Sequence, residues 1–228
     1  MSSTKKLWPL TSEVNDSVTY TSAKFISLEG SEGAGKTTAM QVIVNELSRW
    51  NVPFIQTREP GGQPNAELIR DLLLHSDHLD AQTELLLMFA ARNEHVNKVI
   101  RPALEHQQWV VSDRYVDASY AYQGFGRGID WAVIEYLEHF VIGDTIPNLT
   151  IMLDVDPLVG LERAAQRSAK DRIEKEDITF FENIRKGYLR RAENDPNRIK
   201  LINANQSITA VKGDIIEVLS TFKASIKQ

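Results

Sequence analysis

The chain has 228 residues, 42% of them hydrophobic, which fits one sizeable core better than two domains. The 31 acidic and 26 basic residues give a formal net charge of −5, a balance that argues against polymeric nucleic acid or an anionic membrane as partner. There is no cysteine, which excludes disulfides, thiol catalysis and cysteine-ligated metals and suits a reducing cytoplasm.

The first 23 residues precede the first predicted element. They are rich in Ser, Thr, Asn and Asp, and their one apolar cluster, Leu7–Leu10, is too short for a signal peptide. The longest apolar run of the chain, Leu85–Ala91, is likewise far too short to span a bilayer. We therefore expect a cytoplasmic chain with no membrane segment, a poorly ordered extension over 1–23 and a single domain over 24–228.

From residue 25 onward, apolar runs rich in β-formers alternate with longer segments of helical periodicity. The predicted strands are Phe25–Glu29, Pro53–Arg58, Trp109–Asp113, Leu149–Asp154 and Ile199–Asn203. The predicted helices are Thr37–Trp50, Ala66–His75, Thr83–Glu105, Asp130–Val141, Pro157–Ser168, Phe180–Ala192 and Ile208–Lys223. Pro102 is expected to end or kink its long helix, and Thr179 with Glu182 has the form of a capping box. Strand–helix alternation of this kind predicts an α/β fold: a doubly wound, parallel five-stranded sheet with helices on both faces.

A phosphate-binding motif lies between the first predicted strand and the first predicted helix. The segment Gly30–Thr37 fits G-x-x-x-x-G-K-[ST], the P-loop pattern, in the context that the pattern requires. Its glycines let backbone N–H groups surround phosphate oxygens, and the helix N-terminus adds a positive dipole end. This predicts a P-loop NTPase fold and an ATP site, formed by Gly30, Ser31, Glu32, Gly33, Ala34, Gly35, Lys36, Thr37 and Thr38. Lys36 is expected to reach the β- and γ-phosphates, and Thr37 to ligate Mg²⁺.

Charged residues near the ends of other elements form a second candidate group. Asp113 ends the third predicted strand, where it either holds Mg²⁺ through water or simply begins a turn. Arg114 follows at once, and Arg70 and Arg92 lie on predicted helices; each is either a phosphate-binding guanidinium or a solvated surface group. The segment Thr57–Gly62 either makes a simple exit from the second strand or borders the same crevice.

The segment 163–178 is dense in charges of both signs, among them Arg163, Arg167, Lys170, Arg172 and Lys175. Taken alone, such a segment is either a solvated helix end or a mobile lid that brings an arginine to the transferred phosphate. If the segment is such a lid, Arg167 and Arg172 join Lys36, Asp113 and Arg114 as candidate catalytic residues.

Several of these motifs, in this order and at these spacings, resemble the thymidylate kinase family, specifically its bacterial branch. The resemblance covers about residues 24–223 and is carried by Gly30–Thr37 with Glu32, Thr57–Gly62, Phe89–Arg92, Asp113–Tyr115, Ala121–Gly124 with Arg127-Gly128, and Asp171–Glu174. It implies phosphorylation of dTMP to dTDP with ATP and Mg²⁺, a role in dTTP synthesis and a homodimer. In this branch the lid, rather than the P-loop, supplies the arginine.

The resemblance also implies which residues bind dTMP, namely Glu32, Pro60, Arg70, Phe89, Arg92, Arg114, Ser119, Tyr122 and Gln123. Arg70 and Arg114 would hold the phosphate, and Arg92 would reach a thymine carbonyl. Ser119 and Gln123 would bond the acceptor's polar edges. Tyr122 would crowd the place of a ribose 2′-hydroxyl, and Glu32 would lie near the sugar 3′-hydroxyl and the magnesium ion.

This chain departs from the family pattern beside Arg92. The family often places a thymine-stacking Phe four residues before that arginine, but here the position holds Met88, and Phe89 is three before. We expect Phe89 to stack on the base, with Met88 as the alternative, because the two spacings lie on nearly the same helical face. Ordinary core packing remains open for both.

Two rival functions are a kinase for another nucleotide or nucleoside and a P-loop switch that does not transfer phosphate. A nucleoside acceptor would need a base for its hydroxyl, whereas a nucleotide would not. A GTPase-type switch should carry Asn/Thr-Lys-x-Asp and Asp-x-x-Gly motifs, and the sequence contains neither.

Overall fold

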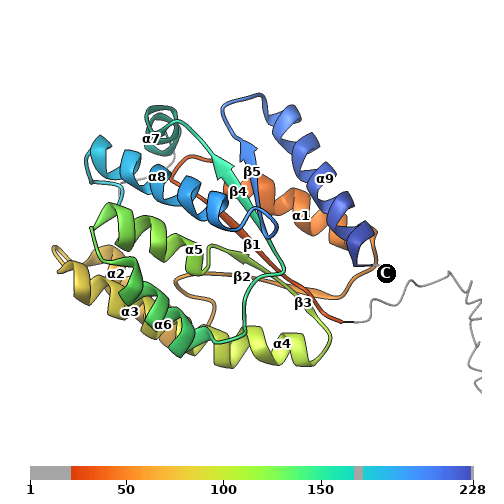
Figure 1. The fold of residues 1–228 in the computed structure, drawn as a ribbon, viewed down its shortest axis with the longest axis horizontal. Helices are drawn as coiled ribbons and strands as arrows, with labels where there is room; N and C mark the ends of the chain where they lie inside the picture. The colour runs from red at the N-terminus through yellow and green to blue at the C-terminus, as the bar shows by residue number, and fades with distance from the viewer. Residues whose placement is uncertain (1–21, 167–171, 227–228) are drawn as a thin grey trace, which may run out of the picture.

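The computed structural model describes residues 22–166 and 172–226, and within them the strands form one parallel sheet. The strand order is β2-β3-β1-β4-β5 (Figure 1). The bounds are β1 Phe25–Gly30, β2 Phe54–Arg58, β3 Trp109–Asp113, β4 Leu149–Asp154 and β5 Ile199–Asn203. The predicted α/β fold with a five-stranded parallel sheet is therefore confirmed. Most of the predicted extension, residues 1–21, lies outside the described residues.

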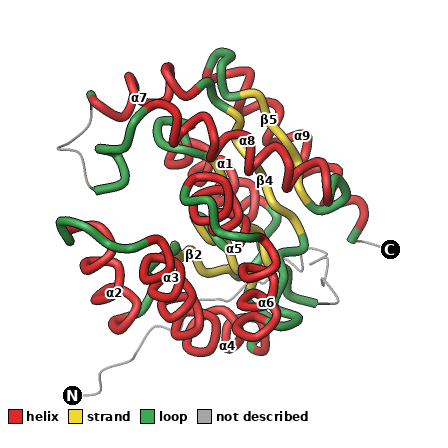
Figure 2. The backbone as a smooth tube through the Cα atoms, turned by 60° about the vertical axis from the view of Figure 1, so that its left-hand side comes forward, coloured by secondary structure: helices red, strands yellow, loops and turns green. Residues whose placement is uncertain are grey.

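Helices cover both faces of this sheet. The helices and π-helical segments (η) are α1 Lys36–Arg49, α2 Pro64–His75, α3 Ala81–His95, η1 Val96–Ile100, α4 Arg101–Glu105, α5 Val116–Ser119, η2 Tyr120–Gly126, α6 Trp131–Ile142, α7 Pro157–Ala165, α8 Ile178–Asn194 and α9 Ile208–Ser225. On one face α1 and α9 pack through Ile43 and Leu219 onto Leu28 and Ile151. Across the sheet, Figure 2 shows α2, α3 and α6 side by side, with α7 and α8 lying apart from them.

Two local predictions need correction, and one helical stretch was missed. Pro102 does not end the long predicted helix 83–105: a π-helical segment comes just before α4, and Pro102 sits in the first turn of α4, where a missing N–H costs least. The predicted capping box on Thr179 is wrong, because Asp177 caps α8 by accepting from the Phe180 N–H at 2.9 Å. The helical stretch 116–126, formed by α5 and η2, was not predicted at all.

The carboxyl ends of three neighbouring strands meet at one edge and position the site. In the register of the sheet, Asp113 at the end of β3 pairs with both Leu28 of β1 and Arg58 of β2. The chain that leaves β1 is the phosphate loop, and the chain that leaves β2 is the turn at Glu59–Gly62. Ligands bind at such an edge in open parallel sheets. Across the described ranges, no helix has the combined length and apolarity that crossing a membrane requires.

Candidate active site

One cleft of about 320 Å³ opens at this edge and collects most of the predicted site residues. Those that line it are Glu32, Gly33, Ala34, Gly35, Lys36, Thr37, Pro60, Arg70, Asp113, Arg114, Tyr122, Gln123 and Arg172. Residues from the phosphate loop, β3, α2 and η2 thus share one space. Among the described residues, Gly30, Ser31, Thr38, Phe89, Arg92 and Ser119 do not line it.

The phosphate loop depends on glycine at two positions for different reasons. Gly33 has φ of 70°, and a Cβ built on it would lie 1.9 Å from the carbonyl oxygen of Gly160 in α7. Gly35 has φ of 93° and caps α1 in the left-handed region, but a Cβ there would meet nothing within 4 Å. Backbone close approach therefore requires glycine at Gly33, and backbone conformation alone favours it at Gly35.

Three charged side chains surround the loop. Lys36 Nζ donates to the Gly30 carbonyl at 2.9 Å, and burial, followed by the charge of Arg114, lowers the pKa of Lys36 to about 8. Arg114 Nη2 donates to Glu32 Oε1 at 2.8 Å, and the Tyr122 hydroxyl donates to the same carboxylate. Burial opposes the charge on Glu32, but Arg114 and Lys36 outweigh it and keep the pKa of Glu32 below its usual range. Two cations and one anion therefore surround the place where phosphate would bind.

Asp113 and Thr37 provide oxygen atoms that fit a magnesium ion. Asp113 Oδ1 is buried and has no hydrogen-bond partner in the part of the chain that the structure describes, and both residues line the cleft. The described residues contain no group of three or more His, Cys, Asp or Glu side chains that could hold a metal. Mg²⁺ does not need one, because it binds proteins through one or two oxygen ligands and completes its shell with water and phosphate.

The acceptor end of the cleft is built by α2, α3 and η2. Arg70 of α2 donates from Nη1 to the carbonyl of Pro60 at 2.8 Å, which joins the α2 arginine to the turn after β2. The ring of Tyr122 lies under the Arg114 guanidinium, 4.8 Å from its centroid. Gln123 is buried and lines the same wall. A guanidinium pair, an aromatic ring and an amide thus face one space beside the loop.

The structure separates Met88 from Phe89. Met88 lines the cleft, whereas Phe89 is buried in the core with Leu85 and Val96. Phe89 was expected in the cleft wall, but it lies in the core instead, because α3 turns its side chain toward the sheet. Met88, the alternative, is the one in place to touch a ligand.

Arg92 is held in a buried polar cluster behind the wall. It donates from Nε to Glu59 at 2.7 Å, from Nη1 to Ser119 Oγ at 3.0 Å and from Nη2 to the Tyr115 carbonyl at 3.0 Å. His95 shares the carboxylate of Glu59 at 2.9 Å. From the sequence, Arg92 was expected to be either a surface group or a group of the cleft wall. Arg92 is only 1% exposed and does not line the cleft, so it is neither.

The described part of the predicted lid docks on the acceptor end. The backbone N–H of Arg172 donates to the Leu74 carbonyl at 3.2 Å, and its Nε donates to the Leu73 carbonyl at 2.9 Å. Its Nη2 lies 2.8 Å from Glu84 Oε2. Arg163 donates instead to the Ala204 carbonyl, away from the cleft, and Arg167 lies outside the described residues.

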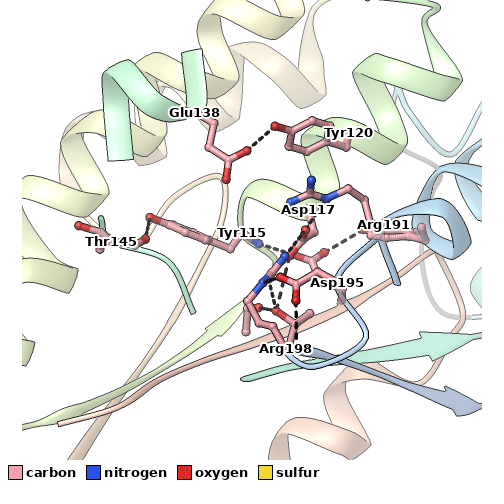
Figure 3. A network of polar contacts seen from close by, with 12 residues as sticks. Tyr115, Asp117, Tyr120, Glu138, Thr145, Arg191, Asp195 and Arg198 are labelled. Carbon is pink, nitrogen blue, oxygen red and sulfur yellow. Dashed lines mark hydrogen bonds and ion pairs between the residues drawn. The ribbon is translucent and has the colours of Figure 1, made fainter. Parts of the chain in front are cut away.

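A buried ionic cluster supports the segment that carries Tyr122 and Gln123 (Figure 3). Asp117 of α5 accepts from Arg198 at 2.7 Å and from Arg191 at 2.8 Å, and these arginines keep the pKa of Asp117 low against the cost of burial. Arg191 also lies over the Tyr120 ring, 3.9 Å from its centroid. The cluster ties α5 to α8 and to the start of β5, so it fixes η2 relative to the sheet.

A second buried acid, Glu29, lies beneath the phosphate loop. It accepts from the Tyr115 N–H at 2.7 Å and from the Tyr188 hydroxyl at 2.9 Å. Burial and the charge of Asp117 raise the pKa of Glu29 to about 8, against the two hydrogen bonds. Glu29 thus connects the end of β1 to the residue after Arg114 and to α8.

Comparison with known proteins shows the family of this chain. The family model described as thymidylate kinase matches residues 28–215. The chain is 49% identical to the thymidylate kinase of Marinomonas sp. over 199 residues, which is 86% of this chain and 94% of the relative, and 49% identical to that of Pseudoalteromonas translucida over 206 residues, which is 90% and 99%. The crystal structure of the thymidylate kinase from Ehrlichia chaffeensis superposes with a TM-score of 0.72 at 34% identity, covering 87% of this chain and 99% of that one.

The chain belongs to the thymidylate kinase family. The expected family and phosphotransferase class are thereby confirmed, and the rival switch function is not favoured. Individual residue roles in this member of the thymidylate kinase family remain predictions, now constrained by the geometry above.

Sequence analysis missed one acidic residue in the cleft of this thymidylate kinase family member. Glu84 is buried, lines the cleft and contacts two site residues, Gln123 and Arg172, together with Arg127. The sequence did hold a signal for Glu84. It lies four residues before Met88, so it shares a helical face with a residue that was already a candidate for contact with the base. Asp117 was also missed, and no spacing in the sequence pairs it with arginines more than 70 residues away.

Proposed function

We propose that this cleft transfers the γ-phosphoryl group of ATP to dTMP, giving dTDP and ADP for dTTP synthesis. The observation that carries the proposal is that the phosphate loop and an arginine-lined pocket open into the same cleft of about 320 Å³. Membership of the thymidylate kinase family supports dTMP as the acceptor over other nucleotides.

The acceptor phosphate needs no general base, because its second pKa is about 6 and it is mostly dianionic near neutral pH. The protein's task is to hold two polyanions in line and to stabilise the charge that spreads over the transferred group. Lys36 and the loop N–H groups hold the donor phosphates. Arg70, which donates to the Pro60 carbonyl, and Arg114, which donates to Glu32, both line the cleft and hold the acceptor phosphate.

The acceptor's sugar and base are assigned to the remaining wall. Glu32 and Tyr122, already bonded to each other, lie where the deoxyribose binds, so that the tyrosine ring crowds a 2′-hydroxyl. Met88 packs on the base, and Gln123 bonds its polar edge. Arg92 and Ser119 stay behind this wall and hold it in place through their mutual hydrogen bond.

Thr37 and Asp113 would hold a magnesium ion, Asp113 through water. The chemistry that such an ion would supply there is neutralisation of part of the phosphate charge. Arg172, which lines the cleft from the lid, is the described arginine placed to add positive charge from that side.

We further propose a homodimer through the apolar face of α3 and α6. Leu86, Val133, Tyr136 and Phe140 are all exposed there, and the Tyr136 and Phe140 rings stack with centroids 6.5 Å apart. Sedimentation of the wild type and of Phe140→Glu should give a dimer and a monomer, and a monomeric wild type would refute this interface.

We also propose that the enzyme works in the cytoplasm, where ATP and dTMP are supplied. A chain without cysteine suits that compartment.

A coupled ADP-release assay with dTMP, dUMP, UMP, AMP and thymidine tests the reaction itself. We expect the highest kcat/KM with dTMP and dTDP as the product. A preference for another acceptor in this panel would replace dTMP, and ATP hydrolysis that ignores every acceptor would favour a P-loop switch.

A further inference from the structure

The orientation of the Gln123 amide is fixed by a carboxylate. Gln123 Nε2 donates to Glu84 Oε1 at 2.8 Å. A carboxylate can only accept, so the amide nitrogen must face Glu84 and the amide oxygen must face the other way. That oxygen, Gln123 Oε1, is buried and has no hydrogen-bond partner among the residues in 22–166 and 172–226. Gln123 lines the cleft, so the cleft wall contains a buried acceptor that the described protein groups leave unpaired.

Glu84 is itself held in place by two cations. It is 1% exposed, and its Oε2 lies 2.8 Å from Arg172 Nη2 and 3.2 Å from Arg127 Nε. Arg127 is anchored in turn by an ion pair with Glu176 at 2.6 Å. Arg127 Nε also reaches Glu84 Oε1 at 3.4 Å, so the two arginines hold the carboxylate in place while Oε1 accepts from Gln123.

A buried acceptor in a binding wall favours a ligand that brings an N–H donor, because an unpaired buried polar group is costly. Once N1 of thymine carries the sugar, the ring has a single N–H, at N3. Cytosine in the same pose places a bare N3 lone pair against the Gln123 oxygen. The fixed amide therefore distinguishes the two pyrimidines by one proton.

We propose that Glu84 is a positioning residue that sets base specificity: it holds Gln123 with its carbonyl oxygen toward the base, so that the pocket accepts a base with a lactam N–H and rejects cytosine. The inference rests on the proposed binding of the acceptor base in this cleft. It assigns Glu84 a role that does not require contact with the substrate.

The test compares the dTMP and dCMP activities of wild type and Glu84→Gln. A glutamine at position 84 can donate or accept, so the Gln123 amide is free to turn and to offer its N–H₂ to cytosine N3. The ratio of kcat/KM for dTMP to that for dCMP should fall about 10- to 100-fold, the range expected for one unpaired buried group. The KM for ATP should not change. Glu105→Gln, the same change at an exposed position on α4, should leave the ratio as it is.

A second variant, Gln123→Met, keeps the proposal testable if loss of the Glu84 charge unfolds the chain. It should lose the dTMP preference to the same extent, and in its background Glu84→Gln should have no further effect on the ratio, since the two residues act as one unit. Retention of the preference in Gln123→Met would overturn the proposal. So would a folded Glu84→Gln enzyme with an unchanged ratio, or an effect of Glu84→Gln that persists without Gln123. A wild type that does not phosphorylate dTMP would refute the proposed function instead.

Discussion

The two halves of the cleft are built in different ways. The donor half is one continuous segment, Gly30–Thr37, whose backbone N–H groups and helix start do the binding. The acceptor half gathers side chains from α2, α3 and η2, and it is held by buried charges such as Glu84 and Asp117. Backbone recognition depends on glycine and helix geometry, whereas side-chain recognition depends on the packing and pairing behind it. Amino-acid substitutions in the two halves should therefore have different kinds of effect.

The largest effect is expected from Asp117→Asn, which breaks the support of the acceptor half. The change leaves the buried guanidinium groups of Arg191 and Arg198 without their shared carboxylate, a loss worth about 3–5 kcal/mol of unfolding free energy. Urea unfolding at neutral pH measures it. Asp195→Asn is the matched control, because Asp195 pairs with the same Arg198 but its side chain is 43% exposed, and it should cost less than about 1 kcal/mol. Equal losses in the two variants would contradict the role given to burial.

Lys36→Ala should disable the donor half without unfolding the protein. The variant removes the one lysine that lines the cleft among the described residues, and turnover should fall by at least ~100-fold, as expected for a lost charge-stabilising group. The coupled ADP-release assay measures kcat, with Lys212→Ala on the exposed side of α9 as control. A near-normal rate in Lys36→Ala would reject the assignment.

Substituting the two loop glycines separates steric from conformational requirements in the donor half. Gly33→Ala places a methyl group against the Gly160 carbonyl and should cost about 2 kcal/mol of unfolding free energy, together with most of the ATP affinity. Gly35→Ala meets no neighbour and should cost only about 1 kcal/mol, from its left-handed backbone. Thermal unfolding and ATP titration of both variants would check this order, and a Gly35→Ala loss as large as that of Gly33→Ala would reverse it.

The two halves of the cleft also differ in how much of each could be predicted from the sequence. The phosphate loop, the five strands and most helices could be predicted because each depends on a local pattern of glycines or apolar residues. Residues 116–126 were missed because Gly124 and Gly126 favour a loop, whereas tertiary contacts of η2 with α8 make the segment helical. Met88 and Phe89 could not be separated from spacing alone, since one helical face serves both the core and the cleft. The burial of Glu84 could not be predicted, because the side chains that pair with its carboxylate come from η2 and the lid.

The smallest predicted effect is a pH dependence confined to the donor half. The pKa of Lys36 is lowered to about 8 in the protein without ligand, so Lys36 is mostly charged at pH 7.5 and mostly neutral at pH 8.5. Because only the charged form attracts phosphate, the Kd for ATP should rise about threefold between these two values as the protonated fraction falls. The phosphates themselves, with a second pKa of about 6, do not titrate in this range. ATP titration of Lys36→Arg provides the control, since a guanidinium stays charged throughout and its Kd should not vary. An equal rise in both proteins would place the titrating group elsewhere, and a flat wild-type profile would mean that Lys36 has the same charge in the free and the ATP-bound protein, which would contradict its lowered pKa.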